Sequence, residues 1–128
     1  SIIITLHLYL LISNIYVTFM IEIQEYLDED GRSPFAKWFN GLNAQAAAKV
    51  TTYLVRIENG NTSSLKSVGQ GVYESRIDWG PGYRVYMGKD GDALVILLGG
   101  GTKKRQENDI ENAKYYWQTY KQRKKGKS

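Results

Sequence analysis

The sequence contains no cysteine and a single histidine, and these absences remove several kinds of chemistry. Without cysteine there is no disulfide, thiolate zinc site or cysteine nucleophile, and a reducing cytoplasm is the expected location. The one histidine, His7, lies in a segment that we expect to be outside the folded domain. Histidine acid–base chemistry and histidine metal sites are therefore excluded from that domain.

Two motifs of phosphate chemistry are also missing. The segment Gly99-Gly100-Gly101-Thr102-Lys103 lacks the spacing of a Walker phosphate-binding loop. No close cluster of carboxylates suggests a two-metal nuclease site, because Asp90 and Asp92 lie where a turn is expected. We therefore expect a protein that works without a metal or a cofactor.

Positive charge is concentrated at one end of the 128-residue chain, which has the length of a single domain. From Lys103 onward there are nine Lys and Arg residues against three Asp and Glu, whereas residues 20–102 carry eight against ten. Tyr115, Tyr116, Trp117 and Tyr120 are interleaved with this charge, a combination typical of nucleic-acid contacts. A solvated helix face followed by a lysine-rich tail explains the charge equally well.

Residues 1–19 form an uncharged apolar run that stops where the charged pattern begins at Met20. The run approaches the ~20 residues of a membrane span, but it has no basic flank and it lacks the features of a secretory signal. We expect Met20 to be the native start and the extension to be separate from the domain. The domain is then predicted over residues 20–122, with no membrane contact and with residues 123–128 as a disordered basic tail.

The patterns within the domain predict an α+β fold. Residues 20–26 alternate as a half-buried strand does. Ser33 and Pro34 are suited to open a short helix over residues 35–40, and Asn43 can cap a longer helix that ends at residues 59–60, so that the two helices form a hairpin.

The second half of the domain is predicted to be a sheet followed by a helix. Residues 61–71 have the composition of a loop, and strands are expected over residues 72–79, 83–88 and 93–98. Asp90-Gly91 is a strong hairpin signal, so the three strands should form an antiparallel meander that ends at the glycines 99–101. A C-terminal helix should start between residues 102 and 108.

Two groups of cations are candidates for a site. Arg76 and Arg84 flank the Gly80-Pro81-Gly82 turn and could together hold a phosphate, or they could form ordinary cross-strand ion pairs with Glu74 and Asp78. The second group, which follows the glycines, consists of Lys103, Lys104 and Arg105. It could contact a ligand at the end of the strand, or it could be the solvated entrance of a helix.

The segment from Glu74 to Gly101, together with residues 102–121, resembles the addiction-module killer proteins. These are a phage-derived, HigB-like branch of the RelE/ParE toxin superfamily. Gly82-Tyr83-Arg84 corresponds to the most recurrent feature of the superfamily, and the pattern after the glycines is narrower and belongs to this branch. The resemblance covers about residues 20–120.

This resemblance implies a RelE-like fold and the toxin role of a type II toxin–antitoxin module. RelE-like members cleave mRNA in the ribosomal A site without metal or cofactor, by attack of a ribose 2′-hydroxyl on the neighbouring phosphate. The implied partners are the ribosome, mRNA and a helix-turn-helix antitoxin. Two alternatives are a ParE-like inhibitor of gyrase that cleaves no RNA, and a degraded toxin that only binds its antitoxin.

Site residues also follow from the resemblance. Arg84 is the candidate stabiliser of the transition state, with Arg76 and Lys103 as further catalytic candidates. RNA-binding roles are implied for Lys66, Lys104, Arg105 and Gln106. No general acid or base is identified, because Glu74 and Asp78 stand where some relatives have basic residues and Ile110 falls near the position of a late Tyr or His.

Overall fold

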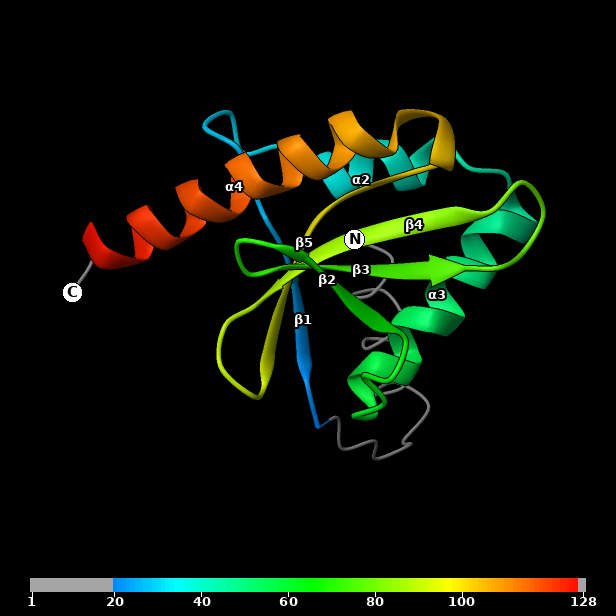
Figure 1. Ribbon diagram of the computed structural model, residues 1–128, viewed down its shortest axis with the longest axis horizontal. Coiled ribbons are helices and arrows are strands. Elements are labelled where there is room, and N and C mark those ends of the chain that lie inside the picture. Colours follow the sequence, from blue (N-terminus) through cyan, green and yellow to red (C-terminus); the bar gives the residue numbers. More distant parts are fainter. Residues whose placement is uncertain (1–19, 127–128) are drawn as a thin grey trace.

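The computed structural model describes residues 20–126. The predictions for residues 1–19 and for residues 127–128 lie outside this range. Within this range the protein is an α+β domain with a five-stranded mixed sheet and three α-helices (Figure 1). In chain order the elements are β1 (Glu22–Glu25), α2 (Pro34–Asn40), α3 (Ala44–Glu58), β2 (Leu65–Gly69), β3 (Val72–Ile77), β4 (Tyr83–Lys89), β5 (Leu94–Gly101), the short 3-10 helix η1 (Lys103–Arg105) and α4 (Gln106–Gly126).

The sheet is larger than the predicted three-stranded meander. Its strand order is β1-β5-β4-β3-β2, in which β1 is parallel to β5 and the other neighbours are antiparallel. The prediction of a loop over residues 61–71 was wrong for residues 65–69, because they form β2 and make a hairpin with β3. Gln70 and Gly71 make its two-residue turn with φ angles of 57° and 83°, as a type I′ turn requires, but without the Asn-Gly or Asp-Gly pair that signals such a turn.

Strand β5 extends three residues beyond its predicted end. Gly99, Gly100 and Gly101 remain in the sheet because they pair with Tyr86, Val85 and Arg84 of β4. On the other side of β5, β1 pairs only as far as Leu97. Beyond Leu97 this edge of β5 has no neighbouring strand among residues 20–126.

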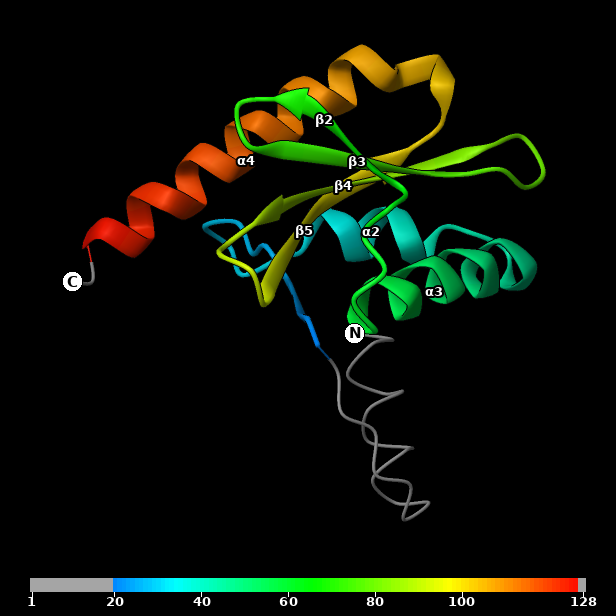
Figure 2. The same cartoon turned by 60° about the horizontal axis from the view of Figure 1, so that its bottom comes forward.

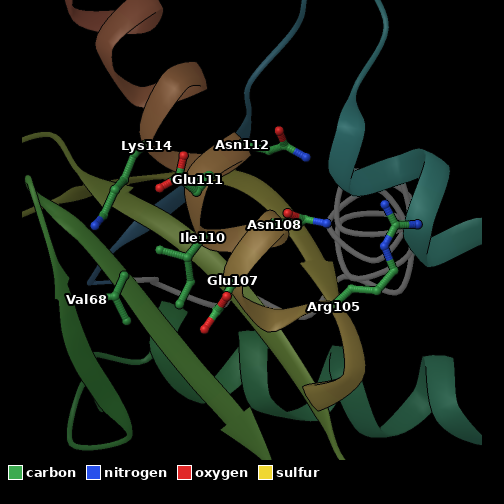
Figure 3. Close-up of a pocket in the computed structure, with 8 residues that line it drawn as sticks. All are labelled: Val68, Arg105, Glu107, Asn108, Ile110, Glu111, Asn112 and Lys114. Atoms are coloured by element: carbon green, nitrogen blue, oxygen red, sulfur yellow. The ribbon is translucent and has the colours of Figure 1, made fainter.

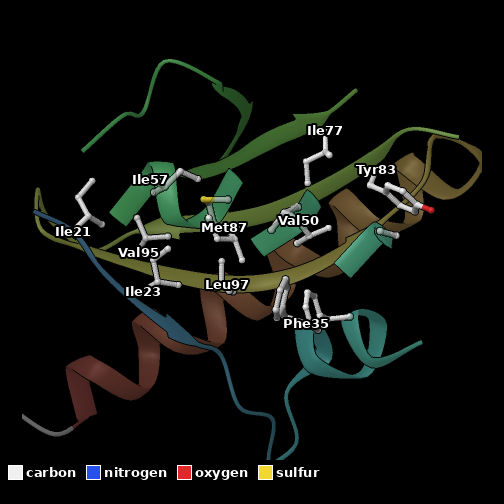
Figure 4. Close-up of a cluster of buried hydrophobic side chains, with 14 residues drawn as sticks. Ile21, Ile23, Phe35, Val50, Ile57, Ile77, Tyr83, Met87, Val95 and Leu97 are labelled. Carbon is white, nitrogen blue, oxygen red and sulfur yellow. The ribbon is translucent and has the colours of Figure 1, made fainter. Parts of the chain in front are cut away.

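Helices cover both faces of the sheet, and each face has its own core (Figure 2). On one face lie α2 and α3, whose Phe35, Val50 and Ile57 pack against sheet residues such as Met87 and Leu97 (Figure 4). Their predicted caps are confirmed: the Ala36 amide donates to Ser33 Oγ at 3.0 Å and the Ala46 amide to Asn43 Oδ1 at 2.8 Å. The connection between the helices spans residues 41–43.

The opposite face is covered by α4, whose Ala113 and Trp117 are buried against the sheet. This helix continues to Gly126, so residues 123–126 are helical and do not belong to the disordered tail that was predicted. The hydroxyl of Tyr120 and the ammonium group of Lys124 both donate to Asp90 in the β4–β5 turn and hold the second half of α4 there. No helix within residues 20–126 combines the length and the apolar character needed to span a membrane.

Candidate functional site

Sheet register brings several of the predicted site residues to one end of the sheet. Arg76 of β3 lies directly opposite Arg84 of β4, which in turn lies opposite Gly101 of β5. One step along, Lys66 of β2 lies opposite Glu74 of β3. Because alternate residues of a strand share a face, Glu74 and Arg76 project to the same side of the sheet. The turn at Gly80-Pro81-Gly82 therefore brings Arg76 and Arg84 together, and Lys66 joins them through the β2–β3 hairpin, which the sequence did not predict.

Arg84 is buried in this cluster, with only 6% of its surface exposed. Its Nε lies 3.6 Å from Glu74 Oε1, and Gln106 at the start of α4 donates a hydrogen bond of 3.0 Å to Glu74 Oε2. Of the two interpretations of Arg84, ion pairing with Glu74 is therefore the one observed. The same contacts connect α4 to the middle of the sheet, and they give Gln106 a contact with protein where an RNA contact was expected.

Tyr86 is a member of the cluster that the sequence did not single out. The side chain is fully buried, and burial, followed by the charge of Glu74, raises the pKa of its hydroxyl. The hydroxyl lies beside Glu74, yet neither it nor Arg84 Nε forms a hydrogen bond of good geometry with the described residues. The interior next to the ion pair therefore contains two buried polar atoms that lack a hydrogen-bond partner of good geometry among the described residues.

Exposed cations surround this interior. Arg76 and Lys66 are exposed on β3 and β2, and none of the exposed cations at this end forms an ion pair within residues 20–126. The other three follow Gly101 and Thr102 and form η1: Lys103, Lys104 and Arg105. The site thus consists of a buried Arg84–Glu74 pair and an exposed rim of positive charge, an arrangement that can hold phosphate groups at the surface.

The first turns of α4 carry mixed charge and border an open hollow of about 730 Å³ (Figure 3). On one side of the helix, Glu107 and Ile110 lie toward Val68 of β2, while Arg105 and Asn112 extend toward α2. Acidic Glu107 and Glu111 make this hollow less suited to a polyanion than the cationic rim. Nowhere in residues 20–126 do three or more carboxylate or histidine side chains gather as they would around a metal ion.

Comparison with known proteins gives one informative relative. No model of a known protein family matches the chain. The chain is 46% identical over 81 residues to an uncharacterized protein of Haemophilus influenzae, and this match covers 62% of the chain and 82% of the relative. At this identity and coverage, the chain belongs to the same family as the uncharacterized Haemophilus influenzae protein.

Proposed function

We propose that this protein is a RelE-like toxin of a type II toxin–antitoxin module that cleaves mRNA on the ribosome without a metal. The sequence motifs that resemble the addiction-module killer proteins support the assignment, especially Gly82-Tyr83-Arg84 and the residues after the glycines. The α+β architecture, with a C-terminal helix across a mainly antiparallel sheet, is compatible with it. Its partners are then a helix-turn-helix antitoxin, mRNA and the ribosome in the cytoplasm.

The observation that carries this proposal is the rim of exposed cations at one end of the sheet. Lys66, Arg76 and the η1 residues come from three separate stretches of chain and form no ion pair among the described residues, and Arg105 acts on the Asp109 carboxyl only from beyond ion-pair distance. Charges that are not neutralised by the protein remain available to RNA phosphates. The rim therefore favours a polyanionic partner over an uncharged one.

Arg76 and Arg84 lie opposite each other on β3 and β4, and the exposed Arg76 is the better placed of the two to contact a phosphate. When a 2′-hydroxyl attacks the adjacent phosphate, negative charge builds up on the phosphoryl oxygens, and a guanidinium group can stabilise it by ~3 kcal/mol. Arg84 is buried against Glu74, so we assign it a positioning role: it fixes β3 and α4, which carry Arg76 and Gln106.

Induced expression followed by primer extension on translated mRNA tests the nuclease proposal. We expect new 5′ ends within coding regions in cells that make the parent protein, and far fewer with Arg76→Ala. Lys49→Ala serves as control because Lys49 is an exposed cation of α3, on the opposite face of the sheet. Unchanged cleavage by Arg76→Ala at equal protein abundance would exclude this role for Arg76.

The burial of Arg84 favours a second function, that of a ParE-like gyrase inhibitor that cleaves no RNA. A guanidinium group that is enclosed by protein and paired with Glu74 cannot reach a scissile phosphate unless α4 moves. A supercoiling assay with purified gyrase distinguishes the two functions. Inhibition of gyrase together with intact mRNA would establish the second and reject the first.

A further inference from the structure

A groove lies at the open edge of β5, between α2 and the first half of α4. Its volume is about 360 Å³, which is at the lower end of the range for small-molecule sites. Trp38 of α2 lines one side and Tyr116 of α4 the other, with Gly99 and Gly100 between them. The groove shares Arg105 and Asn112 with the hollow beside β2, but its other lining residues differ and do not include Arg84.

The floor of the groove is bare backbone. Past Leu97 no strand within residues 20–126 pairs with this edge, so the peptide groups of Gly99 and Gly100 are open to a ligand on that side. Trp38 packs directly on Gly100, whereas a side chain at Gly99 would meet nothing within 4 Å. Glycine lets a flat group approach the backbone closely.

Two cations, a carboxylate and an amide line the groove at different positions. Lys37 of α2 and Arg105 of η1 are exposed cations at its border. Asp109 lies deeper, packed on Gly101, and burial raises the pKa of its carboxyl while the charge of Arg105 opposes the rise. Asn112, one turn further along α4, adds an amide that can donate and accept hydrogen bonds.

Aromatic rings continue from the groove along α4. Tyr116 stacks on Tyr26 with ring centroids 5.0 Å apart, and Tyr115 beside it is 67% exposed. Exposed rings next to cations are the usual platform on which the bases of single-stranded RNA stack.

We propose that this groove is a subsite for one nucleotide of single-stranded RNA and that it prefers guanine. The proposal rests on the proposed function in that RNA is the substrate. Guanine presents two adjacent donors on its Watson–Crick edge, N1–H and the N2 amino group, and one carboxylate such as Asp109 can accept both. Asn112 then donates to O6, and Lys37 and Arg105 bind the flanking phosphates.

An extended peptide is the other ligand that an open strand edge can bind. The observations favour RNA over it for two reasons. The free edge covers only residues 98–101, which is short for a stable added strand. Cations at the border and an acceptor carboxylate inside match the phosphate and the base of a nucleotide, whereas a peptide backbone needs neither.

Titration of the full-length, 15N-labelled protein with the four 5′-nucleoside monophosphates tests the subsite by NMR. We expect GMP to shift the amide signals of Gly99 and Gly100 and the indole signal of Trp38 more strongly than AMP, CMP or UMP. Asp109→Asn should lower the affinity for GMP about tenfold and leave that for AMP unchanged. Lys37→Ala, a surface change, should weaken binding of GMP but not of guanosine, and Lys49→Ala should affect neither.

Equal responses to the four nucleotides, or no response to any of them, would overturn the proposal, and the second result would leave the open edge to a peptide. Failure of the subsite is distinguishable from failure of the nuclease function. Cleavage of mRNA without binding of GMP rejects the subsite alone. Binding of GMP by a protein that never cleaves mRNA rejects the nuclease function and leaves the subsite in place.

Discussion

Arg84 Nε lies 3.6 Å from Glu74 Oε1, and both side chains are almost fully enclosed, at 7% and 4% exposure. The two residues belong to neighbouring strands, and Gln106 connects Glu74 to the first turn of α4. A charge pair in this position ties together β3, β4 and α4, next to the exposed cations of β3 and η1. Loss of one partner leaves the other charge buried and uncompensated.

The first prediction concerns this pair. Arg84→Ala should lower the free energy of unfolding by about 3–5 kcal/mol, because Glu74 would remain as a buried, unpaired carboxylate. The double variant Arg84→Met with Glu74→Gln should lose less, since it contains no buried charge at either position. Urea denaturation followed by circular dichroism measures both. An Arg84→Ala protein with the parent's unfolding midpoint would show that the pair contributes nothing to the fold.

A second prediction separates RNA contact from stability. Arg76→Ala changes an exposed side chain, so the free energy of unfolding should stay within about 0.5 kcal/mol of the parent. The affinity for single-stranded RNA should fall, and the slope of its logarithm against the logarithm of salt concentration should decrease by about 0.7 for one lost phosphate contact. Fluorescence anisotropy with labelled RNA measures the slope. With Lys49→Ala as control, an equal loss in both variants would mean that binding depends on net charge alone.

Local signals in the sequence predicted the elements well where the physical cause is itself local. Ser33 and Asn43 cap their helices as expected, because a cap needs only neighbouring residues. Strand β2 was missed because its turn uses Gln70 at positive φ, which the residue type does not announce. The sheet therefore contains one strand that the sequence did not predict, β2 at one edge, whereas β1 at the other edge is the strand expected over residues 20–26.

The site was harder to predict because burial depends on distant contacts. The sequence around Arg84 would look the same whether its side chain were exposed or buried. In the structure Arg84 is buried where α4 docks on the sheet, through a hydrogen bond from Gln106 to Glu74, 32 residues away in sequence. Tyr86 and Asp109 lie where alternation and helical spacing place them, and only the packed structure gives them raised pKa values. Arg76 and the cations after the glycines were identified because charge beside a turn or a strand end is visible without the fold, whereas Lys66 was identified only through the family resemblance.

A third prediction compares two adjacent glycines of β5. Gly100→Ala should cost about 1–3 kcal/mol, because the new methyl group would overlap the Trp38 ring that packs on this position. Gly99→Ala, in the same strand but with no atom within 4 Å of the added carbon, should change stability far less. Thermal unfolding of the two variants makes the comparison. Equal melting temperatures would mean that Trp38 moves aside without cost.

A fourth prediction concerns the attachment of α4 at Asp90. Hydrogen bonds from Lys124, and then from Tyr120, lower the pKa of the Asp90 carboxyl in the folded protein. A carboxyl with a lowered folded pKa contributes stability above its unfolded pKa of about 3.9, and this contribution is lost as pH falls through the folded value. Because Lys124 is largely exposed, the contribution should be at most about 1 kcal/mol.

Asp90→Asn tests this attachment through its pH dependence. The variant should be less stable than the parent at pH 7, and the two should converge as pH falls through the folded pKa of Asp90. Chemical denaturation at several pH values between about pH 2 and pH 7, a range that spans the titration of carboxyl groups, measures the difference in unfolding free energy between the two proteins. A constant difference at every pH would assign the effect to packing and not to the charge of Asp90.

The fifth prediction concerns Asp109, whose pKa is shifted in the opposite direction to that of Asp90. Burial raises the pKa of this carboxyl in the folded protein, so the ionised form costs stability above the folded pKa, and this cost disappears as pH falls toward the unfolded value. Asp109→Asn should therefore be more stable than the parent at pH 7, with an advantage that shrinks on acidification. Both Asp109 and Glu107 lie in the first turn of α4, where a negative charge is favourable, so Glu107→Gln is the matched control for the lost helix-dipole interaction.

Thermal unfolding of the two variants across pH separates burial from the dipole, because Glu107 is exposed and shares only the dipole interaction. If Asp109→Asn gains stability while Glu107→Gln loses it, the protein retains a carboxylate that weakens its own fold, which is the pattern expected of a group kept for binding. An Asp109→Asn protein no more stable than Glu107→Gln at neutral pH would show that the carboxylate is well solvated, and its role as an acceptor for a base would lose this support.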